Sequence, residues 1–431
     1  MVKKLPLLLM LSSMMIVSAS CKNGAKVEFK DHLMNNPQKT FNTQTSRIND
    51  DYIKSLQSFT ADFMNVAYEG DNTIFSPISI ATCFSMLLDG TKNNSKTELD
   101  NLLHYSDAFN HLDEIKNMLL ATAIDRVDPE SNKQVAYLDI NQSFFVHNRY
   151  KDFIREDYLK TLEDYYFAEA YQGVLESNEM HDLLAKWINN KTNNFFNLKG
   201  DDFKDLEGIL WLVNSIYTKA NWFEPFVEYT GSDTNFTSID GTIKTVKYIC
   251  NYLEYATIYQ NDDYMIATIG LKGGLYFRIL LPKDINKTND IFNSKEAYLN
   301  LLSPKDSGLE KVNAHLHVKI PEFKYVQNYD LIPFLKKLGV NDIFNPAAAD
   351  LTGISDRAKD DGLHVGGAIH AAGIDVNKDG IEAAAYTIIM VAESAIGEEL
   401  PEINLNVDHP FMYTLGFSND LPLFMGIENN L

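Results

Sequence analysis

The sequence predicts an α+β domain in which helices pack on large, mainly antiparallel or mixed β-sheets. Three observations support this fold class. The apolar residues of Ile53–Ala67 recur at helical spacing. Ile209–Tyr217 is a largely apolar run, as expected of a central strand covered on both faces. Helix and strand signals are mixed along the chain and do not follow the alternating βαβ order of a parallel α/β fold.

The remaining predicted elements follow from local patterns. A short strand at Ile74–Phe75 leads into a buried helix over Ile80–Leu88, and Pro77 stands near the first helical position. Two further helices are predicted at Glu179–Phe195 and Pro333–Leu338, the second ending before Gly339. Further strands are predicted at Tyr276–Leu281, Leu316–Ile320 and Phe411–Phe417.

The first residues indicate export. Lys3 and Lys4 precede Leu5–Val17, an almost wholly apolar run that is short for a membrane-spanning helix. The small residues Ser18–Ser20 follow, directly before Cys21. This order resembles the lipobox of bacterial lipoproteins, in which the cysteine becomes the lipidated first residue. The alternative is an ordinary signal peptide with an incidental cysteine nearby.

This N-terminal pattern suggests three regions. We expect residues 1–20 to be a lipoprotein signal peptide, and Cys21 to anchor the protein to the outer membrane of a Gram-negative bacterium, on its periplasmic or cell-surface side. Residues 21–47 are polar and poor in apolar periodicity, which is typical of a flexible tether. Residues 48–431 contain no Pro/Gly/Ser-rich break, so one large domain is expected there.

Charge and cysteine content exclude several classes of protein. The formal charge of −21 argues against nucleic-acid binding, because an acidic surface repels phosphate groups. Besides Cys21 the chain has Cys83 and Cys250, far apart in apolar surroundings. They are either two buried free thiols or one disulfide. Neither a disulfide framework nor a Cys-x-x-Cys metal site fits this spacing.

A search for catalytic and metal-binding motifs finds none that fits. The chain has no Gly-x-Ser-x-Gly, no phosphate-binding Gly-rich loop and no His-Glu-x-x-His. His315 and His317 would share one face of a strand, but no third ligand stands nearby in sequence, and we expect no metal. Asp375–Gly380 resembles the start of an EF-hand loop, yet Tyr386 occupies the position of the bidentate Glu. No cofactor is expected.

The segment Gly380–Val391 has an unusual composition for a surface segment. At strand spacing one face carries only small or apolar residues except Thr387, namely Ile381, Ala383, Ala385, Thr387, Ile389 and Val391. The stretch Ala392–Asn406 that follows is acidic and is interpreted as an exposed loop. A segment able to form a strand is thus continuous with a loop.

Several motifs together resemble those of the serpin family. In chain order they are Asn72–Ile80, Gly90–Leu99, Lys186–Thr192, Val213–Phe226, Ala349–Ile354, Ile369–Val376, Asp408–Phe411 and Leu423–Gly426. Their order matches the family from about residue 48 to the end of the chain. The resemblance implies a serpin fold with three β-sheets, about eight or nine helices and an exposed reactive loop at about residues 380–406.

The resemblance also implies a function. Serpins are suicide-substrate inhibitors of endopeptidases: the protease forms an acyl bond to the loop, and the cleaved loop inserts into the main sheet and traps the enzyme. The expected partners are target proteases and, through the N-terminal lipid, a membrane, and the protein is expected to be a monomer. The alternatives are a non-inhibitory serpin that acts as a binding module, and an enzyme, for which no catalytic residues were found.

The resemblance assigns roles to three sets of residues. A polar cluster beneath the opening sheet would consist of Ser76, Ser79, Asn214 and His370. A breach at the end of the sheet would include Trp222 and Glu322. The hinge of the loop would consist of Lys378, Gly380, Ile381, Glu382, Ala383, Ala384 and Ala385. Lys378 is basic where the family has an acidic residue, and Glu322 is acidic where the family has a basic one, so an ion pair of inverted polarity is expected.

The position of the reactive bond follows from the family's usual spacing. Counting on from Gly380 places the bond between Ser394 and Ala395, next to Val391, Ala392 and Glu393. Counting back from Pro410 leads instead to a position near Glu399. We prefer the first count, because the inserting arm must span the sheet at a fixed rise per residue, whereas the far side can lengthen.

The residues around this bond suggest the class of target. Met390–Ile396 contains no Arg or Lys, which argues against trypsin-like enzymes. Its small residues suit elastase-like and subtilisin-like serine proteases, or papain-like cysteine proteases. Glu393 leaves a glutamyl-specific protease as a further alternative.

Overall fold

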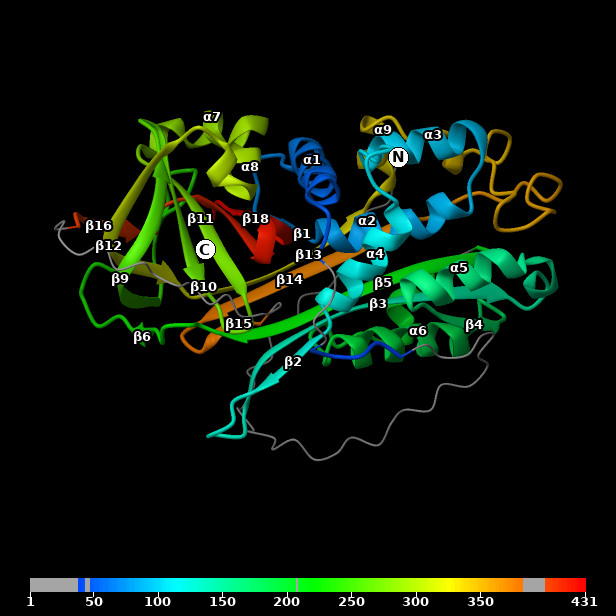
Figure 1. Cartoon of the computed structure of the whole chain (residues 1–431), viewed down its shortest axis with the longest axis horizontal. Helices are drawn as coiled ribbons and strands as arrows, with labels where there is room; N and C mark the ends of the chain where they lie inside the picture. Colours follow the sequence, from blue (N-terminus) through cyan, green and yellow to red (C-terminus); the bar gives the residue numbers. More distant parts are fainter. Residues whose placement is uncertain (1–37, 43–46, 207, 383–399) are drawn as a thin grey trace. The chain divides into compact units, whose positions relative to one another are not determined.

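Secondary structure is assigned in a computed structural model that describes residues 38–42, 47–206, 208–382 and 400–431. All of these residues belong to one unit, Asp31–Leu431. Within the described ranges the chain forms nine α-helices and three β-sheets, of nine, seven and two strands (Figure 1). The predicted α+β class, with three sheets and about eight or nine helices, is confirmed.

The seven-stranded sheet contains the segments that the sequence analysis linked to function. Its strand order is β13 (Phe323–Asp330), β14 (Ile369–Asn377), β15 (Gly380–Glu382), β5 (Leu210–Asn221), β3 (Gln134–His147) and β2 (Ile124–Val127), and β4 (Glu169–Gly173) also pairs with β3. All pairs are antiparallel except β3 with β4. The strand predicted at Ile209–Tyr217 is β5, which lies in the interior of this sheet.

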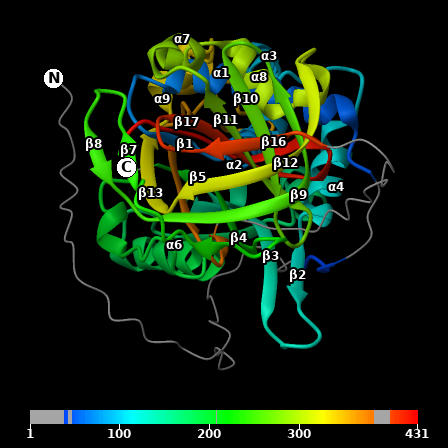
Figure 2. The same ribbon diagram turned by 90° about the vertical axis from the view of Figure 1, so that its left-hand side faces the viewer.

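The nine-stranded sheet forms the second layer. Its order is β1 (Thr73–Phe75), β18 (Leu421–Glu428), β17 (Phe411–Phe417), β11 (Leu275–Pro282), β10 (Tyr264–Gly270), β9 (Tyr248–Gln260), β12 (Glu310–Pro321) and β16 (Glu402–Asn406), with β6 (Val227–Glu228) also on β9. Figure 2 shows β9, β12 and β16 side by side. The two-stranded sheet pairs β7 (Asn235–Thr237) with β8 (Ile243–Thr245).

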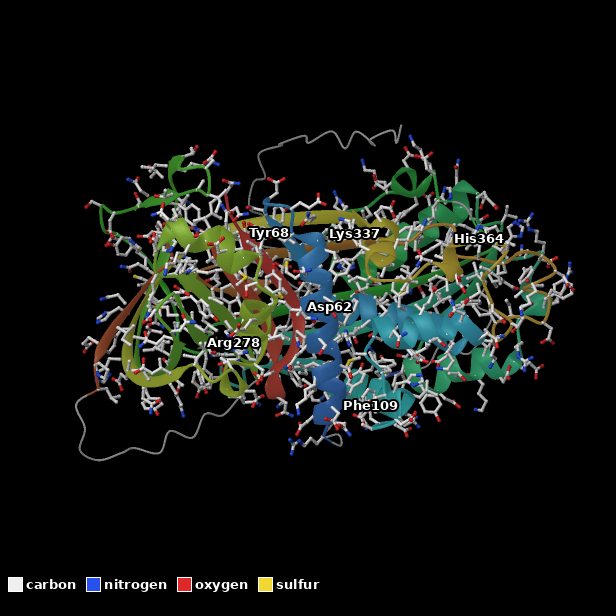
Figure 3. The ribbon with its side chains drawn as sticks, turned by 90° about the horizontal axis from the view of Figure 1, so that it is seen from above. Asp62, Tyr68, Phe109, Arg278, Lys337 and His364 are labelled. Carbon is white, nitrogen blue, oxygen red and sulfur yellow. The ribbon has the colours of Figure 1, made fainter. Side chains whose placement is uncertain are left out.

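The nine α-helices of the described ranges differ in how they begin: five have a side-chain cap and four do not. They are α1 (Asp50–Ala67), α2 (Pro77–Asp89), α3 (Asn93–Leu102), α4 (His111–Ala121), α5 (Glu156–Tyr166), α6 (Asn178–Lys191), α7 (Thr288–Phe292), α8 (Lys295–Leu302) and α9 (Ile332–Lys337). The side chains of Asn49 and Ser177 cap α1 and α6. Figure 3 shows Asp62 on α1, where its carboxylate contacts Lys295 of α8 and His104.

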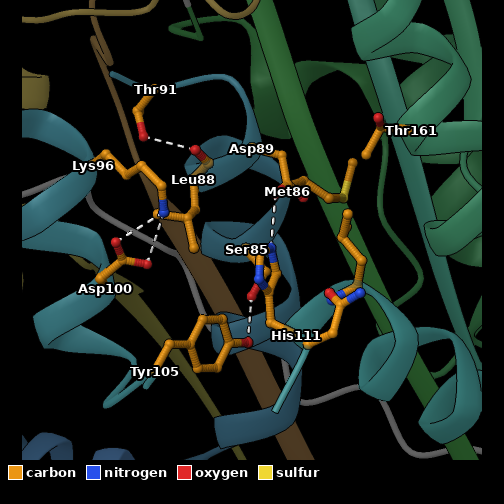
Figure 4. Close-up of polar contacts among 12 residues, drawn as sticks. Ser85, Met86, Leu88, Asp89, Thr91, Lys96, Asp100, Tyr105, His111 and Thr161 are labelled. Carbon is orange, nitrogen blue, oxygen red and sulfur yellow. Dashed lines mark hydrogen bonds and ion pairs between the residues drawn. The ribbon is translucent and has the colours of Figure 1, made fainter. Parts of the chain in front are cut away.

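Helix α2 packs on one face of the seven-stranded sheet, and α6 covers the other face (Figure 1). Ser76 caps α2, and Pro77 stands at its start, near the first helical position as predicted, so the helix begins three residues before the predicted Ile80. Near its other end, Asp89 accepts a hydrogen bond from Tyr166. Asp89 also lies 2.8 Å from His111 Nε2, and Ser85 is hydrogen-bonded to Tyr105 (Figure 4). These contacts join the end of α2 to α4, to α5 and to the segment between α3 and α4.

Two of the differences from the sequence-based expectation have a clear physical reason. The helix predicted at Glu179–Phe195 ends at Lys191, because Asn193 and Asn194 adopt left-handed backbone conformations that a helix does not permit. The predicted loop Ala392–Asn406 includes strand β16, Glu402–Asn406, which pairs in parallel with β12. Its pattern was missed because β16 lies at the edge of its sheet and most of its side chains stay exposed.

Two further observations concern cysteines and membrane helices. Cys83 and Cys250 are both free thiols, which decides between the two alternatives left open by the sequence. Burial raises the pKa of the Cys83 thiol to about 12, so this thiol stays protonated at neutral pH. Among the helices of the described ranges, none is long and apolar enough to cross a membrane.

Candidate functional site at the hinge of the seven-stranded sheet

Strand β15 lies between β14 and β5 at one end of the sheet. It is antiparallel to both neighbours, with the pairs Asp375–Glu382, Val376–Ile381 and Asn377–Gly380 on one side and Asn221–Gly380 and Ala220–Ile381 on the other. Ile381 is 1% exposed and belongs to the main apolar core. The first hinge residues are therefore already part of the sheet.

Beyond β15, strands β14 and β5 form no ladder with each other in the described part of the chain. Because both are antiparallel to β15, they run parallel to one another. On the core-facing side of β5, Leu212 and Ile216 are only half-buried, whereas Leu138 and Ile140 on the neighbouring β3 are fully buried. The facing edges of β14 and β5 thus have no described strand partner over most of their length.

Gly380 allows β15 to approach β5 closely. Its φ of 153° is unfavourable for residues with a side chain. A Cβ atom at this position would lie 1.9 Å from the carbonyl oxygen of Ala220 and 2.7 Å from the Cα of Asn221. Glycine is therefore required here by the backbone of the neighbouring strand.

The turn that precedes β15 is held by both residues assigned to the breach. The indole Nε1 of Trp222 donates a 2.8 Å hydrogen bond to the carbonyl of Asn377, and this indole is buried against Phe226. Glu322 accepts a 3.3 Å hydrogen bond from the backbone N–H of Lys378.

The contact between Glu322 and Lys378 differs from the expected one. The ion pairs found in the described ranges do not include one between these two side chains, and Glu322 contacts the backbone of Lys378 instead of its ammonium group. A backbone N–H is available whatever the side chain at residue 378. The turn can therefore be held without the charge pattern inferred from the family.

Glu382 points to the opposite face from Ile381 and is held there by polar side chains. Tyr217 donates a 2.7 Å hydrogen bond to Glu382 Oε1, and the ammonium of Lys219 lies 3.9 Å from Oε2. Asn193, just after α6, donates to the hydroxyl of Tyr217 at 3.1 Å. Burial, together with the adjacent carboxylate, raises the pKa of Tyr217, so it remains a neutral donor. These contacts could not be predicted from the sequence, because only the register of β15 places Tyr217 and Lys219 beside Glu382.

The predicted polar cluster is brought together as one hydrogen-bonded chain. The N–H of Ser76 donates to His370 Nε2 at 3.0 Å, and the N–H of Ser79 donates to Ser76 Oγ at 3.3 Å. Ser79 Oγ then donates to Asn214 Oδ1 at 2.5 Å. The cluster joins α2 to β14 and β5, the two strands that have no ladder between them.

The electrostatics of this cluster favour neutral groups. Burial lowers the pKa of His370 to about 3, so its imidazole is neutral and Nε2 can accept the hydrogen bond from Ser76. The Nδ2 group of Asn214 is buried with no hydrogen-bond partner in the described residues, and so are both amide atoms of Gln142, its cross-strand neighbour on β3. A buried amide without a hydrogen-bond partner lowers the stability of the folded state. A polar group inserted on this side of the sheet could therefore add stability by pairing with Asn214 or Gln142.

Several predicted residues lie outside the described ranges. These are Cys21, the hinge residues Ala383, Ala384 and Ala385, and the residues around the reactive bond, Val391, Ala392, Glu393, Ser394 and Ala395. The chain is described again from Leu400, and β16 then joins the edge of β12.

His315 and His317 lie on β12, close to the start of β16. His317 Nε2 is 2.9 Å from Glu402 Oε2, and His315 Nδ1 is 2.6 Å from the carbonyl oxygen of Glu254. The ring of Tyr252 packs against both imidazoles. Within the described ranges no group of His, Cys, Asp and Glu side chains has the arrangement of a metal site. These histidines have polar protein partners instead.

Comparison with known sequences identifies relatives of the whole domain. The family model described as "Serpin (serine protease inhibitor)" matches residues 54–430. Leukocyte elastase inhibitor of Equus caballus is 28% identical over 371 residues, covering 82% of this chain and 92% of that protein. A serpin-like protein of Methanosarcina acetivorans is 26% identical over 420 residues, covering 96% of this chain and 94% of the relative.

Solved structures show the same fold. The native state of the thermophilic serpin tengpin superposes with a TM-score of 0.71 at 19% identity, covering 93% of this chain and 99% of tengpin. Cleaved Serpin 42Da gives a TM-score of 0.71 at 24% identity, covering 89% and 100% of the two chains. Together with the strand order around β15, the family match over most of the domain shows that this chain belongs to the serpin family.

Proposed function

We propose that this protein is an inhibitory serpin that traps endopeptidases by inserting its cleaved loop as a strand between β14 and β5. The observation that carries this proposal is the position of β15, which pairs with both strands. Because β15 is antiparallel to both, a loop that continued from it in the same direction would run between them as a further length of the same strand. The absence of a ladder between β14 and β5 in the described residues supports it, because their facing edges can accept a common antiparallel partner.

The registers of β15 predict where the inserted residues would lie. Continued one residue at a time, they pair Thr387 with Asn214 on one side and with His370 on the other. Thr387 is the one polar residue on the otherwise apolar inward face of Gly380–Val391. Its hydroxyl would arrive beside the unpaired amide of Asn214. The sequence of the loop and the polar cluster beneath the sheet are thus matched in position.

The same register supports the position of the reactive bond. The edge of β5 runs from Asn221 to Leu210, and its last residue would pair with Val391. An inserted arm would therefore use the full length of β5 by residue 391 and leave Ser394–Ala395 just beyond it. This favours the bond counted from the hinge over the one near Glu399.

The energy for insertion would come from burial and new backbone pairing. Burial of Ile389 and Val391 in an inserted strand would stabilise the inserted form by about 1.5–3 kcal/mol each. Ladder hydrogen bonds to two neighbours add to this. Relatives named leukocyte elastase inhibitor support elastase-like enzymes as targets, with subtilisin-like and papain-like proteases as further candidates. A glutamyl-specific protease would require cleavage after Glu393.

The decisive experiment is incubation with an elastase-like and a subtilisin-like protease, followed by denaturing electrophoresis. An inhibitory serpin yields a complex that survives SDS, and mass spectrometry of the released C-terminal fragment should find a start at Ala395. Complete cleavage without any complex would support the non-inhibitory alternative, a binding module. A fragment that begins beyond Glu399 would show that the register is wrong.

We also propose that the mature protein is anchored by a lipid on Cys21 in the outer membrane, with residues before the domain acting as a tether. The order of basic, apolar and small residues before Cys21 supports this. A Cys21→Ala variant should move from the membrane to the soluble fraction and keep its inhibitory activity. Recovery of the unaltered protein in the soluble fraction, without lipid mass at its N-terminus, would contradict the anchor.

A further inference from the structure

Part of the segment assigned to the tether contacts the folded domain. Lys39 extends its ammonium group to Asp139 on β3, 2.5 Å from Oδ1, and to the carbonyl oxygen of Ile140. The side chains of Lys39 and Asp139 are only 7% and 9% exposed. A buried ion pair with a backbone contact is unusual for a freely solvated linker. Residues 38–42 therefore belong to the structure of the domain.

The position of Lys39 corresponds to a break in the outer edge of the sheet. Strand β2 pairs with β3 at residues 134–138, and β4 pairs with β3 at residues 143–147. Between them, residues 139–142 of β3 have no strand partner on this edge in the described chain. The contacts of Lys39 with Asp139 and Ile140 fall in this interval. The ammonium group thus supplies a donor where the sheet supplies none.

Asn42 attaches the same segment to the start of β2. Its backbone N–H donates to the carbonyl of Ala123 at 2.8 Å. Its side-chain amide donates to the carbonyl of Asp125 at 2.6 Å and accepts from the N–H of Asp125 at 3.1 Å. This two-way amide contact imitates a pair of ladder hydrogen bonds. Lys39 and Asn42 therefore fix the segment at two separate points.

Phe41 links the segment to the hinge through a row of rings. Its ring stacks on Tyr137 of β3 with 5.9 Å between centroids, and Tyr137 packs on Tyr217 of β5 at 5.8 Å. Tyr217 in turn donates to Glu382 of β15. The row crosses β3 and β5 on the face covered by α6. The row ends at Glu382, the last residue of β15.

We propose that residues 38–42 are an intramolecular strap that braces the outer edge of the seven-stranded sheet and, through Tyr137 and Tyr217, holds β15 between β14 and β5. The strap acts on the starting point of loop insertion. Its consequence for inhibition depends on the proposed function. A hinge strand held in register lets a cleaved loop continue pairing at once, whereas a loosened hinge gives the protease time to hydrolyse the acyl bond and escape.

Hydrogen exchange of the full chain tests the strap without any protease. Lys39→Met removes the cation at similar length, and Phe41→Leu breaks the row of rings while leaving the ion pair in place. Both variants should raise amide exchange at Gly380–Glu382 about tenfold, because local opening becomes easier. Lys54→Met, at an exposed lysine on α1 with a weak ion pair, is the matched control and should leave this exchange unchanged.

The location of the change decides the outcome. Raised exchange at β15 with unchanged exchange at the β17–β18 pair supports the strap, whereas an equal rise in both sheets would mean general destabilisation and overturn it. Unchanged exchange at β15 in Phe41→Leu would also overturn it. If the protein is an inhibitor, more molecules of each strap variant than of the unaltered chain should be consumed for every protease molecule that is trapped. If the unaltered chain forms no SDS-resistant complex with a protease, only the proposed function is contradicted. The hydrogen exchange at Gly380–Glu382 tests the strap without any protease.

Discussion

At the scale of single residues, Gly380 and His370 illustrate how a side chain, or its absence, determines the geometry of the hinge. Gly380 permits β15 to lie against the backbone of β5, where any Cβ atom would overlap a carbonyl oxygen. His370 is buried beneath the sheet and accepts a hydrogen bond from Ser76 in its neutral form. Gly380 acts because it lacks a Cβ atom, and His370 acts because its neutral imidazole can accept a hydrogen bond.

We predict that Gly380→Ala displaces β15 from β5. The added Cβ meets backbone atoms that cannot move independently, so the substitution should destabilise the native form by about 1–3 kcal/mol. Urea unfolding monitored by tryptophan fluorescence measures this difference. Gly366→Ala is the control, because a Cβ there meets nothing within 4 Å. Equal stability of Gly380→Ala and the unaltered chain would show that the hinge is not packed as described.

His370 should make the stability of the domain depend on pH in the acidic range. Its folded pKa of about 3 lies below the value of about 6.5 in an unfolded chain, so only the unfolded state gains a proton between these values. The stabilising contribution is complete above pH 6.5 and is lost as the pH falls, by up to about 1.4 kcal/mol per pH unit.

The contribution of His370 can be isolated with His370→Gln, which keeps an amide oxygen as a hydrogen-bond acceptor and cannot titrate. Unfolding free energies of both chains, measured from pH 7 to pH 4, should differ most in slope below pH 6.5. Parallel curves would mean that His370 is not buried in its neutral form. The comparison is needed because burial raises the pKa of Glu428, which contributes a slope of opposite sign above pH 4.3.

At the scale of elements, β15 is a three-residue strand whose position depends on its neighbours. The turn before it is held by Trp222 and Glu322, and its two faces are held by the core at Ile381 and by Tyr217 at Glu382. If the cleaved loop inserts as a continuation of β15, strand alternation predicts that Ala383 would share the inward face with Ile381 and that Ala384 would share the outward face with Glu382.

This alternation provides a matched pair of substitutions. Ala383→Arg should convert the inhibitor into a substrate, because insertion would bury an unpaired charge at a cost of several kcal/mol. Ala384→Arg, one residue later, should retain inhibition because its side chain would point out of the sheet. The ratio of complex to cleaved product on denaturing gels measures both. Equal inhibition by the two variants would contradict the assignment of faces.

At the scale of the whole molecule, the facing edges of β14 and β5 have no strand partner beyond β15 among the described residues. Cleavage near Ser394 should allow the preceding residues to complete this sheet, so the cleaved chain should unfold at a temperature higher by on the order of 10 °C. Calorimetry before and after limited proteolysis tests this. Cleaved Ala383→Arg should show no such rise, and a cleaved unaltered chain of unchanged stability would argue against insertion.

Much of this architecture could be predicted from local sequence patterns. The periodicity of Ile53–Ala67 is that of α1, and the apolar run at Ile209–Tyr217 is most of β5. Ser76, Ser79, Asn214 and His370 were grouped by resemblance to a family, and the fold brings them into one hydrogen-bonded chain. Short apolar periods and capping residues act over a few neighbours, which is why sequence patterns reveal them.

Other features could not be predicted because they depend on which strands become neighbours. Asn193, Tyr217 and Lys219 are unremarkable in sequence, and they surround Glu382 only once β15 is paired with β5. The edge strand β16 has too little burial to show a clear pattern. The inverted charge pair was inferred from side chains, whereas Glu322 contacts the backbone of residue 378.

The sequence by itself therefore determined the α+β class and the main helices and strands, because these depend on local periodicity. Only the tertiary structure decided that Lys39 lies in a break in the edge of β3 and that a row of rings leads from Phe41 to the hinge. These contacts join residues between 80 and 165 positions apart along the chain, from Tyr137–Tyr217 to Tyr217–Glu382. The polar composition of residues 21–47 predicted a flexible tether throughout. The cost of burying Lys39 is offset by the carboxylate of Asp139, and the local sequence around Lys39 gives no sign of that partner.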